Sequence, residues 1–366
     1  RGARVLGLDR HHPPHDQGSS HGETRITRQA IGEGMEYVPL ALRAHQLWRE
    51  IEAESGETLL RQVGALLISA PALGGVHHGK HDFLEQTLAA ASAFAIPHEI
   101  LTPAEVRARY PLLRLANHEV AYFEPGAGLV YPECCIAAEL ALARSHGAKV
   151  RLGEAALAIE PDGGGVRVVT DSASYEAARA VVCAGPWIGG LLGGPFEALQ
   201  LHRQTQHWFE PDDPAAFAPD RFPVFIWMHG RGEGEWFYGF PRDPDRGGVK
   251  IAAEQFATIT ADPDSLDRLA TKAEAQAVHA RHVAGRIEGL PPAWLRSAAC
   301  VYTTAPASRF IVGPDPARAR VIAVSACSGH GFKHSPAIGE AVAAWALENE
   351  RPAILAPFGP DNLYAG

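Results

Sequence analysis

Apolar residues recur at helical spacing in several segments of the chain. They form one face over residues 39–55, where the apolar positions are Leu40, Ala44, Leu47, Trp48 and Ile51. Pro39 suits the first turn of this helix, and Gly56 suits its end. Similar patterns predict further helices at residues 82–95, 134–145, 264–284 and 336–347.

Other segments are apolar throughout, or alternate between apolar and polar residues, which is typical of strands. Residues 64–70 and 180–185 are almost wholly apolar, and we expect the second to be a central strand covered on both faces. Shorter strands are predicted at residues 3–9, 148–152, 164–170 and 321–325. Alternating aromatic segments separated by Gly and Pro turns predict an antiparallel sheet from residues 207–210, 225–228, 235–240 and 249–253.

This order of elements predicts an α/β fold with two interleaved domains, because mixed α/β segments flank β-rich segments twice. We assign residues 1–60, 132–198 and 296–366 to the first domain, and residues 61–131 and 199–295 to the second. At 366 residues and 46% apolar composition, the chain is long enough to bury a sizeable core.

Charge and cysteine content narrow the function classes. Charged residues make up 20% of the chain and the net charge is -9, with no long basic run, so nothing suggests nucleic acid or membrane partners. No apolar stretch approaches the ~18 residues that a membrane span needs. The 5 cysteines are widely spaced, which argues against a disulfide framework and for a reducing, cytoplasmic location.

Residues 18–22 match the G-x-S-x-G pattern of hydrolases, in which the serine follows a strand and precedes a helix. Here a His-His-Pro-Pro segment comes before it and cannot form a central strand. Ser20 and Glu23 are better interpreted as a capping pair for a following helical turn.

Histidines also invite a metal interpretation, which the spacing does not favour. A cluster in the loop has no Cys or carboxylate at zinc-ligand spacing and comprises His11, His12, His15 and His21. His330 and His334 are four residues apart but flank a turn, and the glutamate of an H-E-x-x-H helix is absent. We therefore expect no metal.

Asp9 closes the strand at residues 3–9. An acid at this place can bind a ribose hydroxyl about 20 residues after a G-x-G-x-x-G turn, or it can be a solvated strand end. The chain contains no such glycine turn, and counting back from Asp9 places it before residue 1. We expect an N-terminally extended version to bind a dinucleotide better than this chain.

Three basic residues have two interpretations each. Arg25 and Arg28 would share a face if their turn were helical, with a carboxylate or phosphate between them, or they are ordinary surface arginines. Lys250 interrupts an otherwise apolar strand, so it is buried for a purpose or faces solvent; the strand alone favours solvent.

Residues 328–336 are the most informative stretch. Two glycines, Gly329 and Gly331, let the backbone approach a ligand closely, and Ser335 with Pro336 then opens a helix. The free N–H groups of a helix start, together with Lys333, favour an anion site. Cys300 lies in a strand of small residues, where a lone cysteine is usually a core residue.

Taken together, these motifs resemble one family, that of monomeric sarcosine oxidase and N-methyltryptophan oxidase. The matching segments occur in the family's order and approximate spacing, and they are residues 21–28, 32–34, 37–40, 238–241 with Lys250, 300–303 and 328–333. The resemblance implies a Rossmann-like FAD-binding domain, the first above, interleaved with an antiparallel-sheet substrate domain, the second. It also implies a monomer that oxidises small secondary or N-methyl amino acids, with hydride transfer to covalent FAD and reoxidation by O2 to H2O2.

The resemblance implies roles for individual residues. Cys300 would carry FAD through a thioether, Lys250 would help activate oxygen, and Arg28 with Lys333 would bind the substrate carboxylate. Arg25 would flank the flavin, and Arg25 and His330 would be catalytic residues together with Lys250. Substrate contacts would come from Tyr238, Tyr302 and His330. Further cofactor contacts would come from Asp9, Ser19, Thr24, Gly329 and Gly331.

Glu254 is a departure, because the family has a histidine at this place. A carboxylate there would pair with a second cationic group on the substrate or retune the pocket, so sarcosine itself is in doubt. The alternatives are an FAD-dependent amine dehydrogenase of the same fold, a truncated non-catalytic flavoprotein chain, and the hydrolase.

Overall fold

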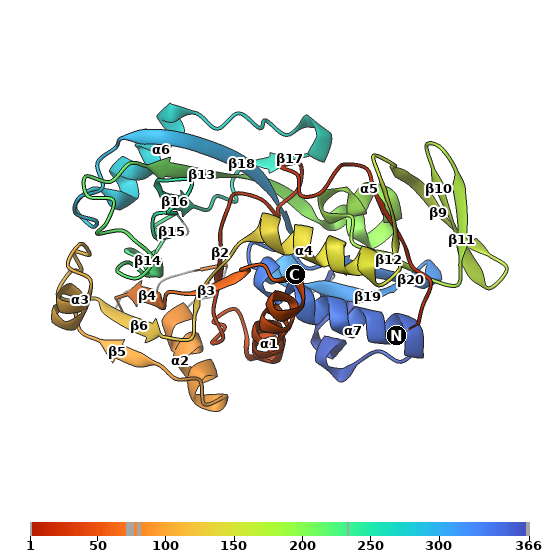
Figure 1. Cartoon of the computed structure of the whole chain (residues 1–366), viewed down its shortest axis with the longest axis horizontal. Helices are drawn as coiled ribbons and strands as arrows, with labels where there is room; N and C mark the ends of the chain where they lie inside the picture. Colours follow the sequence, from red (N-terminus) through yellow and green to blue (C-terminus); the bar gives the residue numbers. More distant parts are fainter. Residues whose placement is uncertain (1, 71–76, 79–81, 233, 364–366) are drawn as a thin grey trace.

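The computed structural model describes residues 2–70, 77–78, 82–232 and 234–363. Figure 1 shows helices and several sheets arranged side by side along the long axis of the molecule. The elements α4 (Pro132–Ser145), α7 (Ser335–Glu348) and β20 (Arg318–Ser325) lie in its right half, and β14 (Val224–Met228) lies in its left half. The mixed α/β fold expected from the sequence is confirmed.

A nine-stranded sheet is the largest element of the fold. Its order is β17 (Ile259–Thr260), β13 (Gln200–Phe209), β16 (Val249–Ala253), β15 (Trp236–Gly239), β14, β4 (Ala65–Ser69), β6 (Val120–Glu124) and β5 (Glu99–Leu101). The ninth strand, β18 (Trp294–Thr304), pairs with β13. All pairs are antiparallel except β14 with β4. Most of the expected antiparallel sheet is therefore confirmed.

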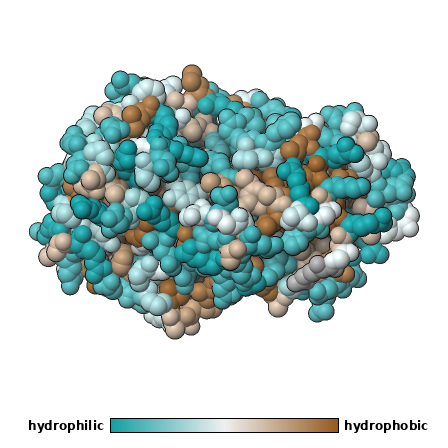
Figure 2. All heavy atoms as spheres, in the orientation of Figure 1, coloured by the Kyte–Doolittle hydropathy of each residue, from teal (hydrophilic) through white to brown (hydrophobic). Residues whose placement is uncertain are grey.

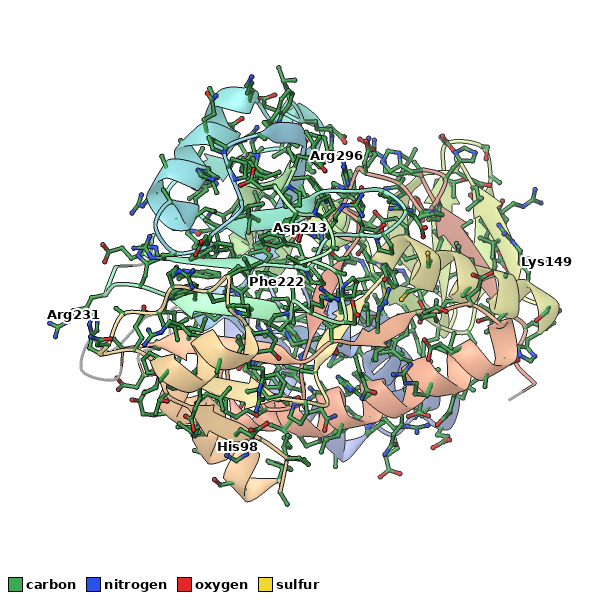
Figure 3. The ribbon with its side chains drawn as sticks, turned by 60° about the vertical axis from the view of Figure 1, so that its left-hand side comes forward. His98, Lys149, Asp213, Phe222, Arg231 and Arg296 are labelled. Carbon is green, nitrogen blue, oxygen red and sulfur yellow. The ribbon has the colours of Figure 1, made fainter. Side chains whose placement is uncertain are left out.

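Alternation along these strands gives the sheet two different faces. Phe225 and Trp227 pack with α3 (Pro103–Arg109) and α6 (Lys272–Val278) in one apolar cluster. Ile226 and Met228 pack instead with α1 (Val38–Ser55), α2 (Phe83–Ala93) and α7. In Figure 3, Phe222 lies inside the molecule, whereas Arg231 and Lys149 lie at its margins.

Four smaller sheets complete the structure. β1 (Leu6–Asp9) pairs in parallel with β8 (Lys149–Leu152), and β12 (Ala180–Val182) pairs in parallel with β20, which also pairs with β19 (Ile311–Asp315). The other two are β9 (Ala156–Asp162) with β10 (Gly165–Thr170) and β11 (Ser174–Ala177), and β2 (Arg25–Thr27) with β7 (Gly128–Val130) and β3 (Leu60–Gln62). A short helix, α5 (Ile188–Leu192), follows β12.

Three local expectations were wrong. The helix expected over 264–284 begins only at Lys272, capped by Thr271, because Arg203 binds the carbonyl groups of Asp267 and Leu269 and holds that segment outside a helix. The strand expected over 180–185 ends at Val182, and Val181 is 42% exposed rather than covered on both faces.

The third error concerns Ser20 and Glu23, since no helix follows them. The chain enters β2 instead, and the Glu23 carboxylate accepts hydrogen bonds from Arg296 at 2.8 and 3.0 Å. Arg296 lies near the upper edge of Figure 3, at the opposite end of that view from His98. Consequently Arg25 and Arg28 do not share a helical face.

The surface is mainly hydrophilic on the face shown in Figure 2, with apolar side chains scattered over it. Exposed large apolar residues such as Leu157 and Leu269 come from different elements, and isolated ones of this kind are normal. Within the described ranges, no helix combines the length and apolar character that a membrane crossing requires.

Candidate active site

The pairing of β13 with β18 places Cys300 in the interior. Cys300 is opposite Gln204 in the register, and its thiol accepts a hydrogen bond from Gln206 Nε2 at 3.4 Å. Burial raises the pKa of the Cys300 thiol, so the neutral form is favoured in the protein alone. Gln206 was not recognised from the sequence, although strand alternation puts it on the same face of β13 as Gln204.

Lys250 is buried on β16, the strand on the other side of β13. Its Nζ donates to Gly22 O at 2.8 Å, to Thr24 O at 2.6 Å and to Thr24 Oγ1 at 3.2 Å. The solvent-facing interpretation is therefore wrong. Burial and the charge of Arg25 lower the pKa of Lys250 well below its ordinary value. No carboxylate is among its three hydrogen-bond partners.

The loop before β2 is fastened to the same strands. Arg25 donates to Thr24 O at 2.9 Å, to Ser19 O at 2.7 Å and to Gln206 Oε1 at 3.4 Å. The Ser19 hydroxyl donates to Val301 O, one residue after Cys300, and lies 3.6 Å from Cys327 Sγ. Ser19, Thr24, Arg25, Lys250 and Cys300 are thus brought together, as the resemblance implied.

A second group of residues forms a chain of buried polar contacts, which we call the acid–imidazole chain: Arg28, Glu33, His78, Glu254 and Tyr302. Arg28 NH2 donates to Glu33 Oε2 at 2.6 Å, and Glu33 Oε1 is 3.3 Å from His78 Nδ1. His78 Nε2 is 2.9 Å from Glu254 Oε2, and Tyr302 donates to Glu254 Oε1 at 3.0 Å.

Two members of this chain, Glu33 and His78, were missed. Glu33 lies in the matching segment 32–34 but was given no role, and His78 has no local motif because its partners lie far away in sequence. Arg28 and Lys333 hold the pKa of Glu33 well below its ordinary value despite burial. Glu33 and His78 also lie near His77 with a spacing that would suit a metal ion, but both ring nitrogens of His78 face carboxylate oxygens, so neither is free to bind a metal.

The stretch 328–336 forms a tight turn followed by α7, as expected. Lys333 Nζ donates to His330 O at 2.7 Å, and burial lowers the pKa of Lys333 to about 7 even though Glu33 opposes that shift. A β-carbon at Gly329, where φ is 82°, would lie 2.8 Å from His78 Nε2 and 3.1 Å from Tyr302 Cε2. Gly329 therefore allows this turn to pack directly on the acid–imidazole chain. Gly331 packs closely on the Ala326 carbonyl.

His330 lies between Glu33 and the aromatic ring of Phe310. Its ring stacks on Phe310 at 4.5 Å, and its Nε2 is 3.1 Å from Ser308 O. Since a carbonyl group only accepts, Nε2 carries the proton, and Nδ1 is an acceptor with no hydrogen-bond partner among the described residues. Burial lowers the pKa of His330 well below its ordinary value, so the ring is neutral. Tyr238 lies nearby on β15, and burial followed by the Glu254 charge raises the pKa of its hydroxyl.

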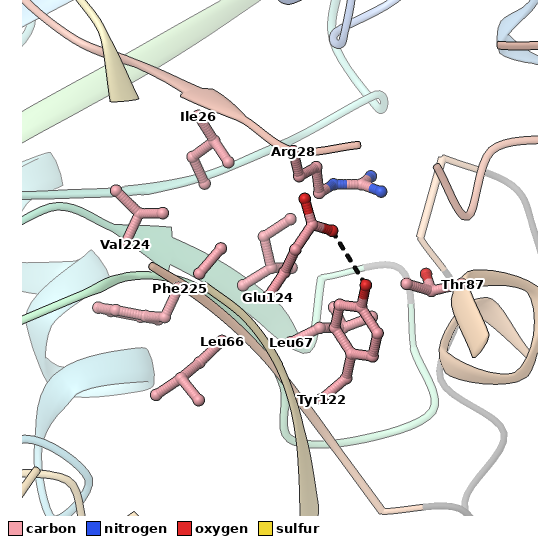
Figure 4. Close-up of a pocket in the computed structure, with 11 residues that line it drawn as sticks. Ile26, Arg28, Leu66, Leu67, Thr87, Tyr122, Glu124, Val224 and Phe225 are labelled. Carbon is pink, nitrogen blue, oxygen red and sulfur yellow. Dashed lines mark hydrogen bonds between the residues drawn. The ribbon is translucent and has the colours of Figure 1, made fainter. Parts of the chain in front are cut away.

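Figure 4 shows a small cavity that is lined by Arg28, Glu124 and Tyr122 together with apolar residues of β4 and β14. Its volume is about 10 Å³, roughly that of one water, so it is too small for an amino acid. Glu124 accepts from the backbone N–H groups of Gln29 at 2.7 Å and Ala30 at 3.2 Å, and from Tyr122 at 3.0 Å. Glu124 thereby fixes the turn that presents Arg28, a role that the sequence did not reveal.

The residues present suit the ring end of a flavin. Among the described residues, several buried polar atoms have no hydrogen-bond partner, and those near Cys300 and the start of α7 include His21 Nε2, Thr303 Oγ1, His330 Nδ1, both ring nitrogens of His334 and Ser335 Oγ. Such atoms are costly unless a partner satisfies them. Asp9 lies farther away at the end of β1, where its Oδ1 accepts from His11 N at 2.8 Å.

The sequence defines the class of protein. The family model described as "FAD dependent oxidoreductase" (DAO) matches residues 1–345, and the chain belongs to this family. It is 40% identical to the monomeric sarcosine oxidase of Streptomyces avermitilis over 372 residues, covering 100% of this chain and 93% of that protein. It is 32% identical to the N-methyl-L-tryptophan oxidase of Salmonella typhimurium, covering 98% and 92%.

Solved structures agree on the fold. NikD, described as an unusual amino acid oxidase essential for nikkomycin biosynthesis, superposes with a TM-score of 0.83 at 21% identity, covering 98% of this chain and 92% of that one. The L-proline dehydrogenase of P. horikoshii gives a TM-score of 0.81 at 19% identity, covering 100% and 92%. FAD as cofactor, expected from the resemblance, is confirmed at the level of the family.

Proposed function

We propose that this protein is an oxidase of secondary or N-methyl amino acids that holds FAD covalently through Cys300 and reduces O2 to H2O2. The observation that carries the proposal is the meeting of two buried groups of residues on one face of the large sheet. Lys250, Thr24 and Cys300 form one group, and Arg28 with Lys333 belongs to the other. The similarity to sarcosine and N-methyltryptophan oxidases supports the same substrate class.

Arg28 and Lys333 would bind the substrate carboxylate. Both already act on the Glu33 carboxylate, so their charges converge on one place. A substrate carboxylate at Arg28 must share the guanidinium group with Glu33, while its negative charge would favour the protonated form of Lys333. The anchored amino acid would lie against Tyr238, Tyr302 and the neutral ring of His330.

When bound, FAD supplies the acceptor for a hydride from the carbon next to the amine nitrogen. Loss of the hydride and of the amine proton leaves an imine, which water hydrolyses, and O2 takes up the two electrons and two protons as H2O2. Ser19, Thr24, Arg25, Gly329 and Gly331 would border the cofactor. Asp9 would bind its ribose, as the place of Asp9 at the end of a parallel strand suggests.

Lys250 would assist the reaction with oxygen. Its three hydrogen-bond acceptors are neutral, so a negative charge that develops beside it would favour its protonated form and be stabilised by it. We further assign residues 1–60, 132–198 and 296–366 to the cofactor and residues 61–131 and 199–295 to the substrate, and we expect a monomer. Lys250 would then reach the cofactor from the substrate domain.

The test is the colour of the acid-precipitated protein. We expect a yellow pellet, which becomes colourless when Cys300 is replaced by alanine, and H2O2 formed in equal amount to an N-methyl amino acid consumed. Flavin in the supernatant of the unaltered protein would refute covalent attachment. Substrate oxidation without peroxide would instead indicate a dehydrogenase, which passes its electrons to another carrier.

A further inference from the structure

Glu254 is a buried carboxylate inside the proposed substrate site, beyond the groups that anchor one carboxylate. It directly follows β16, and the two-residue period of a strand places it on the same face as Lys250. Its side chain is only 4% exposed. Its surroundings include Lys333 and the hydroxyl groups of Tyr238 and Tyr302. A buried charge of this kind is costly unless it is paired and hydrogen-bonded.

Each oxygen of Glu254 has one partner in the described part of the chain, Tyr302 for Oε1 and His78 for Oε2. An ionised carboxylate offers about four acceptor positions, so roughly two remain. Glu254 can therefore accept a hydrogen bond from a ligand without giving up either partner.

The state of His78 follows from its geometry. Both ring nitrogens face carboxylate oxygens, at 3.3 Å to Glu33 and 2.9 Å to Glu254, and only an imidazolium can donate at both. Burial opposes this charge, but Glu254 and then Glu33 outweigh burial and raise the pKa of His78 to about 9. His78 thus donates to Glu33 and to Glu254 at the same time and pairs with both carboxylates.

A ligand donor near Glu254 could belong to the reacting amine or to the substrate side chain. The reacting amine must lose its proton before the hydride leaves, and a carboxylate beside it would hold that proton in place. A cationic side chain never has to lose its proton, and a charge-assisted hydrogen bond is roughly twice as strong as a neutral one. The side chain is therefore the better partner.

We propose that Glu254 is a specificity-determining residue that receives a cationic group at the end of the substrate side chain. The substrates would be secondary or N-methyl amino acids with an amine or guanidine end, a conclusion that rests on the function proposed above. One carboxylate and one imidazole ring separate Arg28 from Glu254 along the acid–imidazole chain. A substrate whose carboxylate is held by Arg28 therefore needs a side chain that reaches past Glu33 and His78 to place its cationic group at Glu254.

The experiment compares N-methyl-L-lysine with N-methyl-L-norleucine, which has a similar chain length but no charge. In the unaltered protein we expect kcat/KM to favour the lysine derivative by about tenfold or more. In Glu254→Gln the ratio should fall to about one, mainly through KM. Glu254→Asp, which keeps the charge, should retain part of the preference.

A matched control is Glu119→Gln, which removes a buried carboxylate that accepts a hydrogen bond from Trp227 at 2.7 Å, outside the site. It should leave the substrate ratio unchanged. An equal ratio in the unaltered protein and in Glu254→Gln would overturn the inference. So would an equal shift in the pH profile of both substrates in Glu254→Gln, because that result would place Glu254 at the reacting amine.

A binding measurement separates this inference from the function. Calorimetry gives the ratio of the binding constants of 6-aminohexanoate and hexanoate. This ratio should exceed one in the unaltered protein and fall in Glu254→Gln, even if neither amino acid is oxidised. That combination would refute the oxidase and keep the role of Glu254. If both amino acids are oxidised and no preference in rate or binding depends on Glu254, the oxidase function would stand and the role of Glu254 would be refuted.

Discussion

The two buried polar groups of this site hold their basic side chains in different ways. Lys250 is held by two carbonyl oxygens and a hydroxyl, whereas Arg28 and His78 are held by the carboxylates of Glu33 and Glu254. The first group is prepared for a negative charge that is not yet present. The second is already balanced, so a ligand must compete with or add to existing pairs. Under the proposed function, the first group would lie where negative charge develops during the reaction, and the second would lie where a charged substrate is recognised.

The largest effect should come from breaking the balanced group. In Arg28→Met the buried Glu33 loses its closest partner, and we expect the free energy of unfolding to fall by about 3–5 kcal/mol. Arg28→Met combined with Glu33→Gln should recover much of that loss in denaturant unfolding, but not the affinity for amino acids. A double variant as unstable as the single one would contradict the pairing described here.

Lys250→Met tests the other group. This variant removes a basic group without leaving a carboxylate unpaired, so the rate of catalysis should fall more than the free energy of unfolding. We expect the rate of flavin reoxidation by O2 to fall about 100- to 1000-fold, with a much smaller change in anaerobic flavin reduction by substrate. Stopped-flow absorbance measures the two half-reactions separately. Equal losses in both would show that Lys250 does not act on oxygen in particular.

His78 gives the balanced group a defined dependence on pH. Its pKa is raised from 6.5 to about 9, so its stabilising contribution is complete below pH 6.5 and is lost as the pH rises through 9. Burial lowers the pKa of Lys333 from 10.5 to about 7, so the contribution of Lys333 makes the folded state more stable as the pH rises over that range. We therefore expect the stability difference between the unaltered protein and His78→Gln to shrink by roughly 1–3 kcal/mol between pH 6 and 10. A difference that is constant across this range would refute the imidazolium.

The smallest effect concerns the affinity for a simple carboxylate. Lys333 has a pKa of about 7, so its protonated fraction falls as the pH rises from 6 to 8. Hexanoate should bind more weakly over this range, by at most tenfold per pH unit, because the bound anion favours the protonated amine. The dependence should disappear in Lys333→Met. If the slope persists in that variant, another group is responsible.

Much of the fold was predictable because local signals agreed. The apolar face of helix α1 and its start and stop signals, Pro39 and Gly56, all lie within one segment. The observed helix starts one residue before the expected start. The expected helix over 264–284 failed because a distant residue, Arg203, determines the conformation of its first part. The burial of Lys250 was also invisible locally, since strand alternation defines two faces but not which one is covered.

The site was predictable only in part, and for a similar reason. The resemblance assigned Cys300, Lys250, Arg28 and Lys333 to one site, and their roles stay predictions. His78 was missed because it contacts Glu33 across 45 residues and Glu254 across 176, and without His78 the link between Glu33 and Glu254 could not be inferred. No spacing rule in a single sequence links positions so far apart.

The hydrogen bonds of Lys250 also set the order of events during synthesis. Their acceptors, Gly22 and Thr24, precede Lys250 by 228 and 226 residues. At about 5–20 residues per second, the ribosome needs roughly ten seconds or more to supply the lysine, and Cys300 emerges later still. The first segment of the site is therefore synthesised before its partners, and the proposed cofactor attachment at Cys300 must follow the synthesis of all three segments.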